Sequence, residues 1–123
     1  MDLVLDTVLK ALQAMRPPFL PYEADIHRMV KERLTEANLP YSHETMIGKG
    51  CRIDYLVGDV GIEIKKGKPM ARILHRQLRR YAGCESVSAL VVVTQRYVRL
   101  PNTINGKPIE SLVLPQLWGV ALP

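Results

Sequence analysis

The chain contains few cysteines and no long apolar run, and each shortage excludes a class of protein. Its 123 residues include two cysteines, Cys51 and Cys84, which do not have the spacing of a metal-ligand pair. Two thiolates cannot supply the four that an iron–sulfur cluster requires as a rule. No stretch approaches the length of a transmembrane helix, and no glycine-rich phosphate loop is present.

The beginning of the chain also lacks a targeting pattern. The first residues have neither the basic start nor the small-residue cleavage site of a secretory signal peptide. Two thiols in such a chain are most simply reduced, so we expect a cytoplasmic protein with no membrane partner. A chain of 123 residues, 47% hydrophobic and 24% charged, is long enough for one core. We therefore predict a single domain over residues 1–123.

What the sequence does have is positive charge and a clear hairpin. The formal net charge of +5 favours polyanionic partners. The segments Arg52–Val57 and Val60–Lys65 are rich in β-branched and aromatic residues, which is typical of strands. Gly58 and Asp59 between them suit a two-residue type II′ turn, which pairs the two valines beside it. We therefore predict a β-hairpin of defined register.

This register places ionisable residues together. Asp54 lies directly opposite Glu63, and Arg52 faces Lys65. Because strand side chains alternate, Asp54, Glu63 and Lys65 project from the same side. Two facing carboxylates repel each other unless a metal ion or a proton lies between them. Hard oxygen ligands suit Mg²⁺ or Mn²⁺, and a lysine beside them can hold or deprotonate an attacking water, which is the chemistry of phosphodiester hydrolysis.

A simpler interpretation of the same hairpin stays open. The other side is predicted to be the core face, formed by Ile53, Tyr55, Val57, Ile62 and Ile64. If the polar side faces solvent, the two acids and the lysine form only a weak surface ion pair.

A helix follows, from near Pro69, which suits a first turn, to Gly83, a good C-terminal stop. Its apolar stripe is Met70, Ile73, Leu74 and Leu78, and Gln77 and Tyr81 lie on the same stripe. A buried glutamine needs a hydrogen-bond partner. We expect Gln77 to bind a water or a substrate phosphate near the metal, unless its amide lies in solvent at the boundary of the buried face. The other side of the helix is basic and carries Arg72, Arg76, Arg79 and Arg80.

These motifs together resemble a known family. The arrangement is Gly50-x-x-x-Asp54, Glu63-x-Lys65 and Gln77-x-x-x-Tyr81. It resembles the PD-(D/E)xK nuclease superfamily, and the last motif looks like its RecB and lambda-exonuclease-like branch. The resemblance covers about the central half of the chain, with Ile53 where the name-giving proline would be. It implies a restriction-endonuclease-like fold and a Mg²⁺-dependent DNA hydrolase.

The resemblance also implies roles for individual residues. Asp54 and Glu63 hold Mg²⁺ or Mn²⁺ together with the Ile64 carbonyl, and Lys65 assists the attacking water. A glutamate from the first core helix often joins the metal in this family, which points to Glu23; alternatively, Glu23 is an acid favoured at a helix start by the macrodipole. Gln77 positions a phosphate or a water, and Tyr81 braces it.

The remaining segments predict an α/β fold with a mixed central β-sheet flanked by helices. We expect helices near Met1–Met15 and Tyr22–Ala37, and strands at Tyr41–Ile47, Val87–Thr94 and Ile109–Leu114. The nearly continuous apolar run of Val87–Thr94 predicts a central strand. The order gives an additional N-terminal helix (1–16), an αβββαβ core (22–94) and a C-terminal extension (95–123) with an edge strand, at most five strands in total. The apolar stripe of the first helix leaves room for a homodimer.

The expected partner is DNA, with RNA as an alternative. Predicted backbone contacts come from the four helix arginines, Arg52, Lys66 and Lys68, so that binding is salt-sensitive and largely independent of sequence. The segment Gln95–Arg99 adds an aromatic residue and two arginines, which can stack on or grip a nucleic acid or form a plain loop rim. Two other function classes are a non-catalytic nucleic-acid-binding or assembly module on the same scaffold, and an enzyme acting on a nucleotide or another phosphoester.

Overall fold

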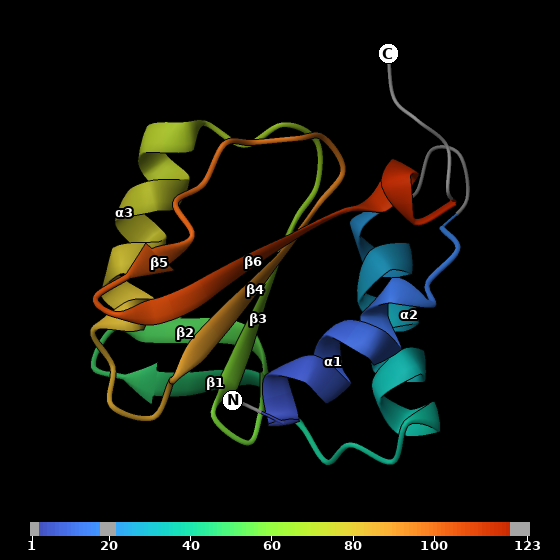
Figure 1. Cartoon of the computed structure of the whole chain (residues 1–123), viewed down its shortest axis with the longest axis horizontal. Helices are drawn as coiled ribbons and strands as arrows, with labels where there is room; N and C mark the ends of the chain where they lie inside the picture. Colours follow the sequence, from blue (N-terminus) through green and yellow to red (C-terminus); the bar gives the residue numbers. More distant parts are fainter. Residues whose placement is uncertain (1–2, 18–21, 119–123) are drawn as a thin grey trace.

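The computed structural model describes residues 3–17 and 22–118 (Figure 1). The helices are α1 (Leu3–Gln13), α2 (Glu23–Glu36) and α3 (Ala71–Ala82), with a short 3-10 helix η1 (Leu114–Trp118). The strands are β1 (Ser42–Gly48), β2 (Cys51–Val57), β3 (Val60–Lys65), β4 (Ala89–Thr94), β5 (Thr103–Ile104) and β6 (Lys107–Val113). No helix in these two ranges is long and apolar enough to cross a membrane.

The strands form one mixed sheet in the order β1-β2-β3-β4-β6-β5 (Figure 1). β1, β2 and β3 are antiparallel neighbours, β3, β4 and β6 run parallel, and β5 pairs antiparallel with β6. The element order α2-β1-β2-β3-α3-β4 agrees with the predicted αβββαβ order. The predicted α/β architecture, a mixed sheet flanked by helices, is therefore confirmed.

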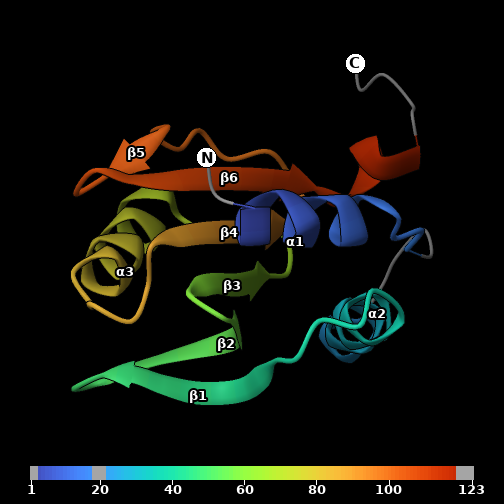
Figure 2. The ribbon, with the colours of Figure 1, turned by 60° about the horizontal axis from the view of Figure 1, so that its bottom comes forward.

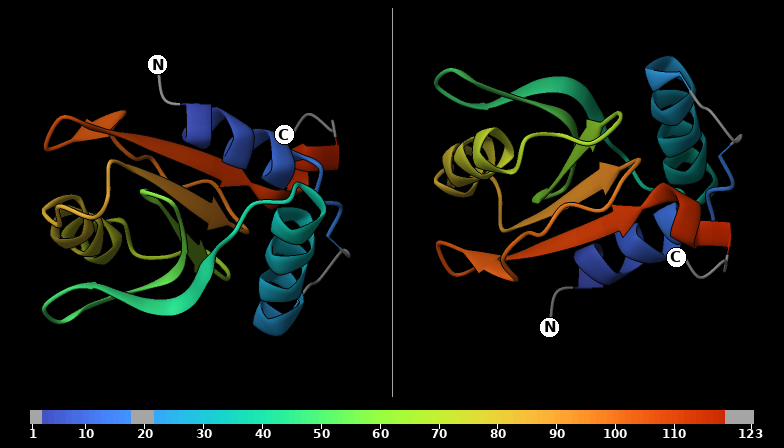
Figure 3. Two further views of the ribbon diagram at one scale, coloured as in Figure 1. Left: turned by 90° about the horizontal axis from the view of Figure 1, so that it is seen from below. Right: turned by 90° about the horizontal axis from the view of Figure 1, so that it is seen from above.

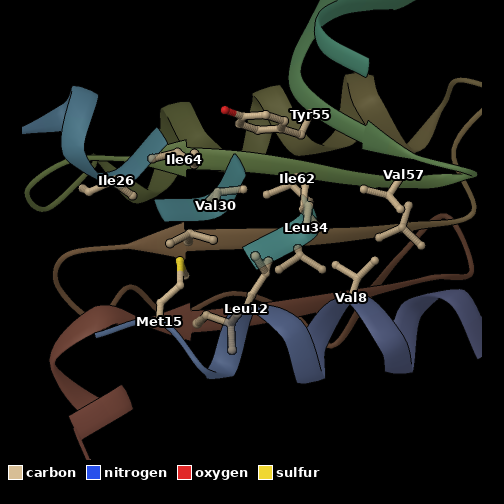
Figure 4. Packing of buried hydrophobic residues seen from close by; sticks show 14 of the residues in the cluster. Val8, Leu12, Met15, Ile26, Val30, Leu34, Tyr55, Val57, Ile62 and Ile64 are labelled. Carbon is tan, nitrogen blue, oxygen red and sulfur yellow. The ribbon is translucent and has the colours of Figure 1, made fainter. Parts of the chain in front are cut away.

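Helices cover both faces of this sheet. α1 and α2 lie on one face and α3 on the other (Figures 2 and 3). Each face of the sheet has its own hydrophobic core, which we call the α1–α2 core and the α3 core. In the α1–α2 core, Val8 and Leu12 of α1 pack with Val30 and Leu34 of α2 against Ile62 of β3, and all five are fully buried (Figure 4). Each helix thus buries one apolar side, as amphipathic helices do.

β4 lies between the two cores. Its side chains alternate, so that Val91 and Val93 enter the α1–α2 core while Leu90 and Val92 enter the α3 core. All six residues of the strand are buried. The prediction that this apolar run forms a central strand is confirmed, and the reason is that a strand covered on both faces needs apolar side chains at every position.

The C-terminal extension differs from the prediction. A sixth strand, β5, was not expected; it pairs with the first two residues of β6 around the turn at Asn105 and Gly106. Ile109–Leu114 was predicted to be an edge strand, but β6 lies between β4 and β5. β5 has only two residues, so its local pattern carries no periodicity that identifies a strand. Residues 1–2 of the predicted first helix and the tail 119–123 lie outside the described residues.

The predicted core face of the hairpin is wrong at one residue. Tyr55, Val57 and Ile62 enter the α1–α2 core, but Ile53 enters the α3 core. A β-carbon placed at Gly61 of β3 would come within 2.5 Å of the Ile53 Cδ1 atom, which shows that Ile53 fills the space above this glycine. The pairing of β2 with β3 stops at Tyr55, and Figure 2 shows α3 between β6 above and the β1–β2 hairpin below.

Two apolar stripes are also used differently from the prediction. Leu74 and Leu78 of α3 are buried, but Ile73 is 57% exposed and Met70, the residue before the helix, is 68% exposed, because the sheet covers only part of the stripe. On α1, Leu12 is fully buried inside the chain. Val4 of the same stripe is 37% exposed, and the homodimer stays a prediction.

Candidate active site

The β2–β3 hairpin begins the site. Gly58 has a φ of +59°, a conformation that favours glycine, and Val57 pairs with Val60 across the turn as predicted. The backbone ladder continues only to the pair of Tyr55 and Ile62. At the next residue, Asp54, the backbone of β2 has left β3.

The two acids meet through side-chain-to-backbone hydrogen bonds in place of the lost backbone pair. The Ile64 N–H donates to Asp54 Oδ2 over 2.7 Å, and the Asp54 N–H donates to Glu63 Oε1 over 3.3 Å. The predicted regular pair of Asp54 and Glu63 is therefore corrected, although the structure does bring the two residues together. Their carboxylates lie at the point where the strands separate.

Glu63 is the centre of the site. Only 4% of the residue is exposed, so the interpretation of this acid as part of a solvated sheet face is wrong. Its Oε2 atom accepts a hydrogen bond from Gln77 Nε2 at 3.0 Å and lies 3.2 Å from Lys65 Nζ. The Tyr81 hydroxyl lies 3.3 Å from the same oxygen. Side chains from β3 and α3 thus hold one carboxylate in a fixed orientation.

Gln77 and Tyr81 of α3 form the support of this carboxylate. They are four residues apart, so both side chains lie on one side of the helix. Gln77 Nε2 also donates to the Tyr81 hydroxyl at 2.8 Å, and that hydroxyl donates to the Arg52 carbonyl at 2.9 Å. Burial, followed by the Glu63 charge, raises the pKa of Tyr81, so that it remains a donor. In this structure Gln77 orients Glu63, a partner that the helical pattern did not reveal.

The charges in the site are not balanced. Burial raises the pKa of Glu63, the Asp54 carboxylate raises it further, and the Lys65 ammonium opposes both effects. Two carboxylates facing one ammonium leave one negative charge when both acids are ionised. Such a buried excess charge favours either a bound proton or an added cation.

The raised pKa predicts how stability depends on pH when no divalent metal is present. The folded protein keeps a proton on Glu63 that the unfolded chain releases near the ordinary pKa of 4.5. The stabilisation is therefore complete below pH 4.5 and is lost as the pH rises through the folded-state pKa. We expect the free energy of unfolding, measured with urea in a chelator, to fall over this interval more steeply in the parent protein than in Glu63→Gln. Parallel curves for the two proteins would contradict the raised pKa.

The donor set fits a divalent metal ion with few protein ligands. Asp54 and Glu63 offer carboxylate oxygens at one place, and the Ile64 carbonyl, the third predicted ligand, belongs to the residue between Glu63 and Lys65. Within residues 3–17 and 22–118, no three His, Cys, Asp or Glu side chains gather closely enough to hold a metal. Mg²⁺ is characteristically bound by one or two carboxylates, with water and substrate phosphate completing its shell. The residues therefore suit Mg²⁺ or Mn²⁺ better than a metal that needs a complete protein cage.

Glu23, the predicted additional ligand, is the first residue of α2 and is exposed. It does not join the two acids in a cluster. The start of α2 nevertheless approaches the end of β3, because Lys66 Nζ lies 5.6 Å from the ring centroid of Tyr22, the residue before Glu23. Its position also agrees with the alternative of an acid at a helix N-terminus.

Most of the predicted basic residues are available for binding. Five of them are exposed and have no ion-pair partner among the described residues: Lys68, Arg72, Arg76, Arg79 and Arg80. Lys66 is exposed beside Tyr22. Arg52 differs from the prediction, because it pairs with Met46 of β1 and its Nη2 lies 3.4 Å from Glu44 Oε2. Arg52 therefore contributes its carbonyl to the site and does not face Lys65.

Thr94 is a residue that sequence reasoning did not include in the site. It ends β4 and pairs with Lys65 across the parallel ladder, so that both side chains lie on the same face. Its hydroxyl oxygen is buried and has no hydrogen-bond partner in the described part of the chain. Few buried polar groups lack a partner in folded proteins, so this hydroxyl is a notable polar group on the face that carries Lys65. The signal in the sequence was a single polar residue at the end of an apolar run.

Comparison with protein-family models, with curated proteins and with solved structures found no match for this chain. Its function therefore has to be argued from the chemistry of the site itself.

Proposed function

We propose that this protein is a metal-dependent nuclease that hydrolyses phosphodiester bonds of DNA, on a restriction-endonuclease-like fold. The observation that supports this most directly is the buried Glu63 carboxylate, held between Asp54, Lys65 and the Gln77–Tyr81 pair. A module that only binds a polyanion gains nothing from two carboxylates placed next to its phosphate. A hydrolase gains a metal site from them.

Each residue has a definite task in this proposal. Asp54 and Glu63, with the Ile64 carbonyl, would hold Mg²⁺ or Mn²⁺, which would polarise the phosphodiester and lower the pKa of a nearby water. Lys65 keeps one N–H on Glu63 and has two further N–H groups for the attacking water and for the phosphoryl oxygen where charge develops. Its side chain is 29% exposed, so this ammonium can reach substrate.

Gln77 and Tyr81 act on the chemistry through Glu63. Their hydrogen bonds fix the carboxylate before substrate binds, so that little reorganisation is needed during the reaction. Arg76 and Arg80 are exposed and one helical turn apart on α3, the helix that also carries Gln77. Such arginines bind phosphates without reading the base sequence.

The proposal is tested by a cleavage assay on the purified chain. Single-stranded, duplex and branched DNA of the same sequence are incubated with Mg²⁺, with Mn²⁺ and with a chelator, beside RNA of that sequence. We expect cleavage of DNA in Mg²⁺ or Mn²⁺ and none in the chelator. Cleavage of RNA alone would reject the assignment of the substrate.

Two results would overturn the assignment to nucleases. Cleavage that persists in the chelator would exclude the metal site as its cause. DNA binding without cleavage in either metal would instead support a non-catalytic nucleic-acid-binding or assembly module.

A further inference from the structure

A second feature lies at the start of α3. The chain leaving β3 and the chain leaving β4 enclose an open pocket with a volume of about 610 Å³. This size falls in the range of small-molecule binding sites. The side chains that characterise it are Lys68, Met70, Arg72, Tyr97, Val98 and Arg99.

The pocket combines an apolar surface with cations. Tyr97 is 62% exposed and Met70 is 68% exposed, whereas Val98, which also lines the pocket, is buried. Lys68, Arg72 and Arg99 line the same pocket, and no acidic residue is among its lining residues. An exposed aromatic ring surrounded by positive charge is complementary to a ligand that is flat, apolar on its faces and attached to phosphate.

The pocket and the acidic site lie at the same end of the sheet. Lys65 ends β3 and Thr94 ends β4, and these two residues pair in the parallel ladder. The segments that follow are tied together, because the Gly67 N–H donates to Gln95 Oε1 at 2.9 Å. Lys65 contacts Glu63, and Lys68, three residues further along the chain, lines the pocket. A nucleic-acid backbone bound along them passes both places.

We infer that this pocket binds an unpaired nucleobase of the strand whose phosphate is bound at the acidic site. Tyr97 stacks on the base, and Lys68, Arg72 and Arg99 contact the phosphates on either side of it. The inference rests on the proposed function for the identity of the strand. It adds that the substrate is single-stranded at this position, because a base in a duplex has both faces covered by its neighbours.

The test separates base stacking from phosphate binding. Binding is measured in a chelator, by fluorescence anisotropy, to a labelled oligo(dT) and to an abasic oligomer of the same length. We expect Tyr97→Ala to weaken binding of oligo(dT) by roughly 5- to 100-fold and to leave binding of the abasic oligomer unchanged. Tyr97→Phe should bind oligo(dT) like the parent protein, because the ring is kept.

Two controls make the result specific. Met46→Ala removes another exposed apolar side chain, on β1, which does not line the pocket, and should change neither affinity. Arg99→Ala should weaken binding of both oligomers, because it acts on phosphates. Equal loss of both oligomers in Tyr97→Ala, or no loss of either, would overturn the inference even if metal-dependent cleavage is observed. A loss confined to oligo(dT) in a chain that cleaves nothing would support the pocket and reject the nuclease.

Discussion

Replacing Lys65 by alanine is expected to lower the rate of metal-dependent DNA cleavage by about 10²- to 10⁴-fold, the range for a positioned proton-transfer or charge-stabilising group. Lys65 Nζ lies 3.2 Å from Glu63 Oε2. Glu63 and Asp54 are the two acids that the β2–β3 hairpin brings together. Removing the ammonium takes away the proposed donor to the reacting phosphate but leaves both carboxylates. Affinity for DNA should change far less than the rate, because the other basic residues remain.

The measurement is single-turnover cleavage at saturating protein, which separates chemistry from binding. Lys66→Ala is the matched control: it removes the same charge one residue along the chain, where the side chain is exposed. It should lower affinity at low salt and leave the single-turnover rate within a few-fold of the parent protein. Equal rates for the parent protein and Lys65→Ala would reject the proposed chemistry.

The local geometry of the hairpin was predictable because it depends on short-range rules. Gly58 can adopt a positive φ, which fixes the turn and therefore the pairing of Val57 with Val60. The same register placed Asp54 near Glu63. What the alternation of side chains did not show is that β2 leaves β3 at this point, which takes Ile53 to the other core.

This departure depends on contacts between distant parts of the chain. Gly61 leaves space that Ile53 fills. Across the parallel ladder, Gly61 pairs with Leu90 of β4. A strand read by itself shows only a period of two residues. Ile53 shares a core with Leu74 and Leu78 of α3, and no pattern within β2 predicts that contact.

The helix shows the same limit. Its periodicity correctly placed Gln77 and Tyr81 on one side, but not which atoms they bind. Gln77 was expected to point to a phosphate or a water, and in the structure it donates to Glu63 and Tyr81. Met70 belongs to the same apolar stripe but is exposed. The stripe alone does not show where the sheet beneath the helix ends. That exposed end forms part of the proposed base pocket.

The metal site can be tested without any measurement of cleavage, through Asp54→Asn. The substitution keeps an oxygen that can accept the Ile64 N–H, a hydrogen bond of 2.7 Å in the parent protein, so the hairpin should remain folded. It also removes one of the two like charges that face each other. The metal-free variant should therefore be at least as stable as the parent protein, since the Asp54 carboxylate raises the pKa of Glu63 by repulsion.

Divalent metal should separate the two proteins. A ligand that binds only the folded state raises the free energy of unfolding by RT ln(1 + [L]/Kd). We expect the melting temperature of the parent protein to rise with Mg²⁺ or Mn²⁺ concentration, and that of Asp54→Asn to stay nearly constant. Cleavage by the variant should fall by about a thousandfold, which corresponds to roughly 4 kcal/mol of lost charge stabilisation.

Asp59→Asn is the control, because Asp59 is an exposed acid in the turn of the same hairpin. It should respond to metal as the parent protein does. If Asp54→Asn gains as much stability from metal as Asp59→Asn, the ion is bound elsewhere, and Asp54 is not its ligand. If neither the parent protein nor Asp59→Asn responds to either metal, the acid pair is satisfied by Lys65 and a proton alone, and the hydrolytic mechanism loses its basis.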